Sequence, residues 1–220
     1  MRPPFSIAWL LIFIFLVSLV MVIAQLGLLT IAFDKLGLSL SSALLLLSAS
    51  LFGSLINLPL FTIETDTPVD TSIPPLPGLL RQRLPFEGKT IIAINVGGCL
   101  IPLMFSLYLM QLYQLNWPRI ILAIIIVSSV CYVFSRPLPG LGIGMPILVA
   151  PLTAAITALV VDLEHSAPLA YISGTLGVMI GADLLRLKNI RRMGAPLASI
   201  GGAGTFDGIF LTGIVAVLLA

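Results

Sequence analysis

The sequence predicts an all-α integral membrane protein of about seven transmembrane helices, with its N-terminus in the cytoplasm and its C-terminus outside. Of its 220 residues, 59% are hydrophobic and only 9% are charged, whereas a soluble domain carries about 25% charged residues. Apolar runs near the roughly 20 residues that a membrane helix requires recur along the whole chain. This composition excludes the soluble, disordered and disulfide-rich classes. It predicts a single transmembrane domain over residues 1–220.

The expected spans are seven apolar runs. The longest polar connection, residues 64–89, contains five prolines and is expected to be a cytoplasmic loop. A Pro/Gly stretch, residues 137–146, leads into the fifth run and is alternatively a re-entrant segment. The seven runs cover approximately residues 6–31, 38–63, 90–112, 120–134, 143–162, 167–187 and 195–220.

The last span is expected to be broken between Pro196 and Gly204. Gly201, Gly202 and Gly204 occupy three of four consecutive positions, and each glycine inside a helix costs about 1 kcal/mol relative to alanine. An unwound segment or a very close helix contact explains such a cluster better than a continuous helix does.

Orientation follows from the basic residues, because Lys and Arg favour cytoplasmic loops. With the N-terminus inside, only Lys35 and Arg119 of the eleven basic residues fall outside. The basic residues lie in short loops between apolar runs, so the expected partner is the lipid bilayer and not nucleic acid. The residues expected inside are Arg2, Arg81, Arg83, Lys89, Arg136, Arg186, Lys188, Arg191 and Arg192.

Two aspartates, Asp183 and Asp207, lie within the sixth and seventh runs. A charge at the centre of a membrane helix costs at least roughly 2.5–3.5 kcal/mol, so such residues are candidate functional residues. If the seventh helix begins near Ile200, both carboxylates reach one layer on the cytoplasmic side. Asn57, Asn95 and Thr153 are expected at a similar level, which predicts a polar cavity open to the cytoplasm. Alternatively, Asp183 pairs with one of the nearby basic residues Arg186, Lys188 and Arg191. The two asparagines alternatively form ordinary interhelical hydrogen bonds.

Three motifs resemble an uncharacterised family of prokaryotic multi-span membrane proteins: Leu55-Ile-Asn-Leu-Pro59, Asn95-Val-Gly-Gly-Cys-Leu-Ile-Pro102 and Ile200-Gly-Gly-Ala-Gly-Thr-Phe-Asp-Gly-Ile-Phe-Leu-Thr212. The resemblance implies a multi-pass protein of the prokaryotic inner membrane and assigns no activity.

A second, weaker resemblance is to the presenilin and signal-peptide-peptidase class of intramembrane aspartyl proteases. These use one aspartate on each of two consecutive helices, and the resemblance places Asp183 and Asp207 at those positions. The chain departs from the pattern in two places. The second aspartate of the class follows a glycine in a Gly-x-Gly-Asp motif, whereas Thr205-Phe206 precede Asp207. Ala182 precedes Asp183, where an aromatic residue is usual.

Three functions remain open at this point. The favoured one is proton- or cation-linked transport of a small solute, with Asp207 as the charged site. The first alternative is hydrolysis of a membrane peptide by a dyad of Asp183 and Asp207 that shares one proton. The second is a structural or assembly role, and oligomerisation is left open. No metal and no cofactor is expected, because ATP-binding and zinc-protease motifs are missing. The expected ligand-binding residues are Asp207, Asn57, Asn95, Thr153, Gly201, Gly202 and Gly204.

Overall fold

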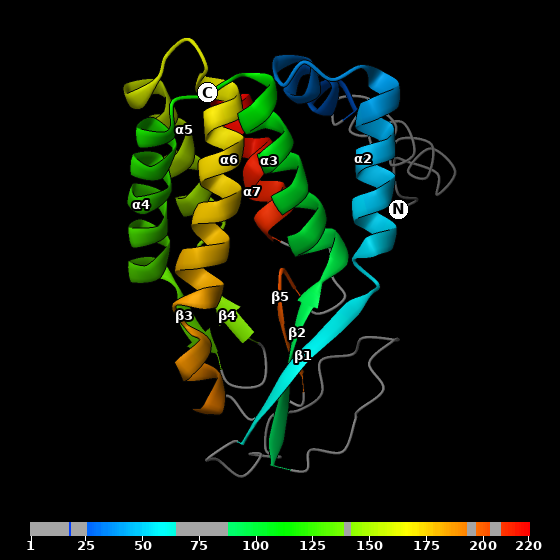
Figure 1. Ribbon diagram of the computed structural model, residues 1–220, viewed down its shortest axis with the longest axis vertical. Helices are drawn as coiled ribbons and strands as arrows, with labels where there is room; N and C mark the ends of the chain where they lie inside the picture. The colour runs from blue at the N-terminus through cyan, green and yellow to red at the C-terminus, as the bar shows by residue number, and fades with distance from the viewer. Residues whose placement is uncertain (1–17, 19–25, 65–87, 139–141, 193–196, 203–207) are drawn as a thin grey trace, which may run out of the picture.

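The computed structural model describes residues 18, 26–64, 88–138, 142–192, 197–202 and 208–220. These residues form a group of helices with two small sheets at one end, as Figure 1 shows. We call the end that carries the strands the sheet end. The opposite end, with the turns at 36–39, 113–116 and 162–165 and the C-terminus, is the helix end.

The helices are short, and several begin at proline or at a capping residue. Ser39 caps α2 by accepting a hydrogen bond from the backbone N–H of Ser42. Pro102 and Pro118 lie in the first turns of α3 and α4, where the missing N–H of proline costs nothing. The helices are Leu26–Lys35, α2 (Leu40–Gly53), α3 (Ile101–Leu112), α4 (Trp117–Phe134), α5 (Val149–Val161), α6 (Ser166–Val178) and α7 (Gly208–Leu219). The π-helix Val96–Leu100 leads into α3, the π-helix Met179–Leu184 extends α6, and a 3-10 helix follows at Leu187–Arg192.

The larger sheet has the order β1-β2-β5. β1 (Asn57–Glu64) pairs antiparallel with β2 (Lys89–Asn95), with an irregularity between Pro59 and Phe61. β2 pairs in parallel with β5 (Leu197–Ile200), so that Ile94 lies opposite Ile200. A separate hairpin joins β3 (Arg136–Leu138) to β4 (Gly142–Gly144).

The prediction of an all-α fold is therefore wrong, although most described residues are helical. The run 38–63 is not one helix: α2 ends at Gly53 and β1 follows. The run 90–112 begins as β2, whose β-branched residues Thr90, Ile91 and Ile92 suit an extended chain. The run 143–162 is helical only from Val149, and residues 137–146 contain the β3–β4 hairpin where a re-entrant segment was the alternative.

Two described helices, Trp117–Phe134 and Ser166–Leu184, are long and apolar enough to cross a membrane. They correspond to the fourth and sixth expected spans. A third appears if Leu26–Lys35 and α2, which meet at an angle of 108°, are counted together. The apolar helices Val96–Leu112, Val149–Val161 and Ile209–Leu219 are shorter. Most of the first expected span, residues 6–31, lies outside the described residues.

The expected interruption of the last span agrees with the residues that are described there. Leu197–Ile200 form β5, Gly201 and Gly202 have positive φ angles of 81° and 93°, and α7 begins at Gly208. Residues 193–196 and 203–207 lie outside the described residues, so Pro196 and Gly204 themselves are not placed.

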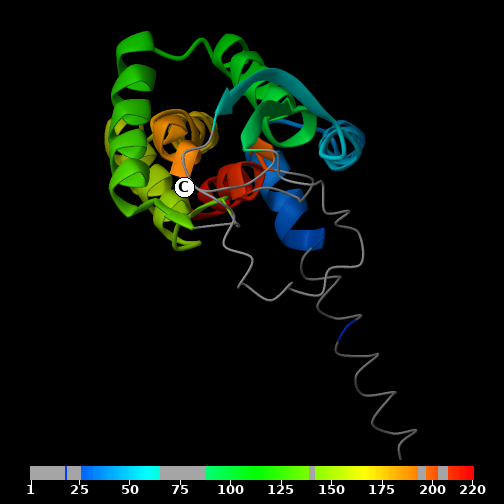
Figure 2. The same cartoon turned by 90° about the horizontal axis from the view of Figure 1, so that it is seen from below.

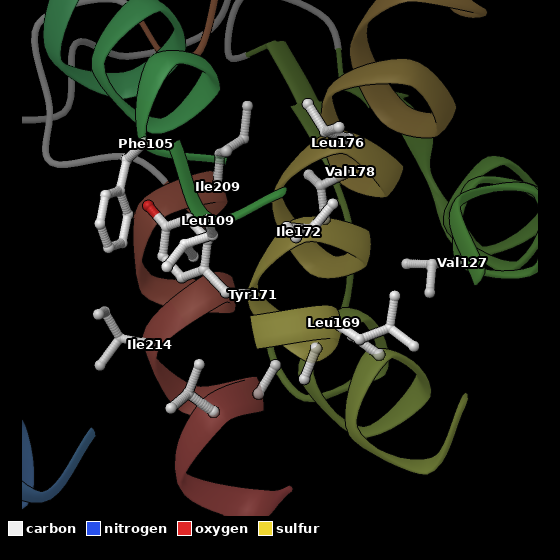
Figure 3. Packing of buried hydrophobic residues seen from close by; sticks show 14 of the residues in the cluster. Phe105, Leu109, Val127, Leu169, Tyr171, Ile172, Leu176, Val178, Ile209 and Ile214 are labelled. Atoms are coloured by element: carbon white, nitrogen blue, oxygen red, sulfur yellow. The ribbon is translucent and has the colours of Figure 1, made fainter. Parts of the chain in front are cut away.

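The core centres on α6, where every residue from Pro168 to Val178 is buried. Figure 3 shows Tyr171 of α6 beside Phe105 and Leu109 of α3 and Ile209 of α7. The rings of Phe105 and Tyr171 pack edge to face, with their centroids 4.9 Å apart. In the view along the long axis, α7 lies among the other helices (Figure 2). This packing holds α6 and α7 together, and α7 lies above β5 in the view of Figure 1.

Candidate functional site

The candidate site lies where the two parallel strands end and their helices begin. β2 ends at Asn95 and continues into the π-helix at Val96, while β5 ends at Ile200 and continues into Gly201-Gly202. Because the strands are parallel and in register at Ile94 and Ile200, both glycine-rich segments leave the sheet at the same edge.

Asn95 ties this edge together. It is fully buried, and its Nδ2 donates to the Ser54 carbonyl oxygen at 2.7 Å and to Asn57 Oδ1 at 3.1 Å. Its Oδ1 accepts a 2.7 Å hydrogen bond from the Gly98 N–H and so caps the π-helix. The structure thus brings Asn57 and Asn95 together, as the interhelical alternative expected, although each lies at the end of a strand.

Ser199 extends this cluster to β5. Its Oγ donates to Asn57 Oδ1 at 2.6 Å, and its carbonyl oxygen accepts from the Gly202 N–H at 3.2 Å. Ser199 was not predicted as a site residue, because nothing in the local sequence indicates that residues 57 and 199 meet. Its position two residues before Gly201 was the only available signal.

Two glycines permit the close approach of the backbones. A methyl group at Gly97 would collide with the backbone of Ser50 and Ser54 at the end of α2. At Gly201 it would lie 2.6 Å from the Gly98 carbonyl carbon and 2.7 Å from the Cys99 N, at a φ that L-residues rarely adopt. Ser50 Oγ also donates to the Gly97 carbonyl oxygen at 2.7 Å. α2, the first π-helix and the turn after β5 therefore meet backbone to backbone.

Asp183 faces this junction from the second π-helix. Its Oδ2 accepts a hydrogen bond from the Gly201 N–H at 3.1 Å, and its side chain is half-buried. One turn earlier, Met179 Sδ lies 3.2 Å from Cys99 Sγ of the first π-helix. Two π-helices from distant parts of the chain thus contact each other beside a carboxylate, and π-helical turns frequently mark functional sites.

Arg186 is directed to a different part of the molecule. Its guanidinium donates to the carbonyl oxygens of Tyr132 and Ser135 at 2.6 and 2.9 Å and lies 4.2 Å from the centroid of the Tyr132 ring. These contacts place a positive charge at the C-terminal end of α4, where it interacts favourably with the helix dipole. The side chain of Arg191, another predicted partner of Asp183, lies outside the described part of the chain.

The remaining predicted residues are Thr153, Gly202, Gly204 and Asp207. Thr153 donates to the Val149 carbonyl oxygen of its own helix at 2.7 Å. Gly202 takes part only through the turn after β5. Asp207 and Gly204 lie outside the described residues. Within the described ranges, no group of three or more His, Cys, Asp or Glu side chains is arranged to hold a metal ion.

A second charged group lies at the helix end. Arg119 contacts Asp162 at 2.8 Å, and the His165 N–H donates to the same carboxylate at 3.3 Å. Burial by itself raises the pKa of Asp162, but the hydrogen bond and charge of Arg119 and the bond from His165 lower it below its usual value overall. This pair joins α4 to the turn after α5, far from Asp183, and we assign it a structural role.

Comparison with known proteins identifies a family but no activity. No curated protein and no solved structure matches the chain. The sequence profile of one family matches residues 51–219 and therefore includes Asn57, Asn95, Asp183 and Asp207. This result confirms the predicted resemblance to an uncharacterised family. The chain belongs to the family described as "Protein of unknown function (DUF1614)".

Proposed function

We propose that the chain is a multi-pass protein of the prokaryotic cell membrane, with the sheet end in the cytoplasm. The two long apolar helices support this location, and so does the distribution of charge. Lys89, Arg136, Arg186 and Lys188 lie toward the sheet end, whereas Arg119 and Lys35 lie at the helix end (Figure 1). This distribution follows the tendency of basic residues to remain in the cytoplasm.

We further propose that the protein is an intramembrane aspartyl hydrolase that cleaves membrane-embedded peptides. The hydrogen bond from the Gly201 N–H to Asp183 Oδ2 carries this proposal. This bond joins Asp183 of the sixth run to the glycine-rich segment that leads to Asp207 of the seventh run. Asp207 follows Gly201 by six positions and directly precedes Gly208, the first residue of α7. Asp207 lies outside the described residues and is included in the proposal on the basis of the sequence alone.

The chemistry requires two carboxyl groups that share one proton. The ionised carboxylate takes a proton from a water molecule, and the resulting hydroxide adds to the carbonyl carbon of the peptide. The protonated carboxyl group donates a hydrogen bond to the carbonyl oxygen. The tetrahedral intermediate then collapses and the C–N bond breaks. The leaving nitrogen takes up the proton that the first carboxylate removed from water, which gives a carboxylic acid and an amine.

In this proposal Gly201 positions Asp183. Its N–H donates the hydrogen bond that orients the Asp183 carboxylate. The hydrogen bonds that link Asn95, Asn57 and Ser199 hold the Gly201-Gly202 turn in the position that presents this N–H. Asn57 and Asn95 are therefore positioning residues here and not ligands of a solute.

Proton-linked transport is the second candidate, and one observation favours it. Tyr171 and Thr175 lie four residues apart on α6, eight or more residues before Asp183, and both contact the position of Gly213 on α7. Both hydroxyl groups are fully buried, and neither has a hydrogen-bond partner of ordinary geometry in the described part of the chain. Buried polar groups of this kind line proton paths in membrane proteins.

Two assays on the full chain in lipid vesicles separate these functions. In the first, a single-span peptide is incubated with the wild type, Asp183→Asn, Asp207→Asn and the control Asp34→Asn, and its fragments are identified by mass spectrometry. Asp34 is exposed and lies at the helix end. The proposal predicts cleavage by the wild type and Asp34→Asn, and none by the other two variants.

The second assay measures proton flux with a pH-sensitive dye inside the same vesicles. Flux that is lost in Asp207→Asn but retained in Asp183→Asn, without peptide cleavage by any variant, would reject the hydrolase and support transport. A peptide analogue with a hydroxyl group in place of the scissile carbonyl provides a further check. It is expected to raise the melting temperature of the wild type but not of Asp183→Asn.

A further inference from the structure

The strand β1 exposes an unusually apolar surface. No charged residue occurs between Lys35 and Glu64, so α2 and nearly all of β1 are uncharged. Leu55 is 72% exposed, and Phe61 is 52% exposed. We call the exposed apolar residues of this segment the β1 surface; they are Leu55, Ile56, Leu58, Leu60 and Phe61. A contiguous exposed apolar area marks a surface that is covered in the native environment.

The β1 surface differs from the exposed face of an ordinary sheet in two respects. Consecutive side chains of a strand point to opposite faces, and residues 58–62 are all exposed, so both faces of β1 are uncovered. β1 is also an edge strand of the described sheet, with β2 on one side only. Pro59, which has no N–H to donate, is typical of such an edge.

We infer that β1 lies at the boundary between headgroups and acyl chains of the cytoplasmic leaflet, with lipid as the partner of the β1 surface. This inference rests on the proposed membrane location but not on the proposed hydrolase activity. Apolar side chains on both faces favour contact with acyl chains. The backbone groups of the outer edge require hydrogen-bond partners, which hydrocarbon does not offer. The leaflet boundary satisfies both requirements at once.

The neighbouring elements agree with this position. The β1 surface continues the exposed apolar residues of α2, including Leu45, Leu51 and Phe52. At its other end β1 finishes at Glu64, which lies opposite Lys89 across the hairpin. A strand that begins beside an apolar helix and ends at a pair of charged residues matches the change from acyl chain to water.

Tryptophan fluorescence tests the inference directly in the full chain. Trp9 and Trp117 are replaced by phenylalanine, and Phe61→Trp or Ile125→Trp is added as a single probe. Ile125 is 56% exposed near the middle of α4, so Ile125→Trp is the matched control for lipid contact. Each variant is placed in phosphatidylcholine–phosphatidylglycerol vesicles with bromine near the start or near the end of the acyl chains.

We expect a greater loss of Phe61→Trp emission with bromine near the start of the chain than near its end. The control is expected to show the opposite order. If bromine quenches Ile125→Trp but Phe61→Trp is quenched by acrylamide in the water and not by bromine, the inference fails and the membrane location stands. If neither agent quenches Phe61→Trp, protein covers β1, and the inference fails as well. If bromine quenches neither probe, both the inference and the membrane location fail.

Discussion

Asn95 combines several structural roles in one buried side chain. It caps a π-helix, binds the end of α2 and connects to Asn57, and these contacts use both Nδ2 protons and Oδ1. The sequence identified Asn95 as a polar residue within an apolar run, but it could not distinguish a ligand from a structural residue. That distinction depends on the partners, which come from positions 54, 57 and 98.

We predict that Asn95→Ala lowers the free energy of unfolding by about 2–4 kcal/mol. The change removes a helix cap and leaves buried partners unsatisfied, at about 1–3 kcal/mol for each buried group and about 1 kcal/mol for the cap. Thermal unfolding in detergent measures the effect. Asn116→Ala is the matched control, because Asn116 precedes α4 without a side-chain capping bond. Equal melting temperatures for both variants would contradict the assigned role of Asn95.

The lowered pKa of Asp162 predicts that the free energy of unfolding decreases at acidic pH. Its pKa is lower in the folded protein than in the unfolded chain, so ionisation favours folding. The stabilisation is present above the unfolded pKa, near 4, and disappears as the pH falls through the lower folded pKa. We expect Asp162→Asn to lower stability at neutral pH by about 1 kcal/mol or less, since Arg119 is half-exposed. The difference from the wild type should vanish in strong acid.

The exposed Glu164 provides the control for this experiment. Melting temperatures of the wild type, Asp162→Asn and Glu164→Gln are measured across the acidic range. A difference between the wild type and Asp162→Asn that persists below the folded pKa would show that another property of the side chain, and not its charge, stabilises the fold.

At the scale of elements, the sequence predicted α4 and α6 well but not the elements at the sheet end. A predominantly apolar run of 18 residues such as Trp117–Phe134 suits a helix. The segments Asn57–Ile63 and Thr90–Ile94 lie at one end of longer apolar runs, and hydrophobic periodicity alone does not separate a strand from a buried helix there. Their pairing with each other, and with Leu197–Ile200, decides in favour of strands. That pairing is a long-range property that no local pattern contains.

The contact between α2 and the first π-helix predicts a sensitive position at Gly97. We expect Gly97→Ala to destabilise the fold by about 1–3 kcal/mol, the usual cost of forcing an extra methyl group into a packed site. The control is Gly27→Ala, because a methyl group at Gly27 meets no atom within 4 Å. Thermal unfolding of the two variants compares them. An unchanged melting temperature for Gly97→Ala would show that α2 moves away from the junction without loss.

At the scale of the whole molecule, the structure separates a helix end from a sheet end, and the proposed orientation assigns them to opposite sides of the membrane. We predict that Glu164→Cys reacts with a membrane-impermeant maleimide from outside intact cells. Lys188→Cys is expected to react only after the cells are opened. Both native side chains are exposed, so burial within the protein would not explain an absence of labelling. Reaction of Glu164→Cys from the cytoplasmic side alone would overturn the orientation.

The parallel pair β2–β5 joins residues that are far apart in the chain: Ile91 lies opposite Leu197, about 106 positions later. A ribosome adds about 5–20 residues per second, so β2 waits about 5 to 20 s for its partner during synthesis. Asp183 is made late in that interval, and it accepts no hydrogen bond from the Gly201 N–H until Gly201 follows it 18 positions later. The junction that holds Asp183 is thus completed only after the glycine-rich segment that follows β5 has been made.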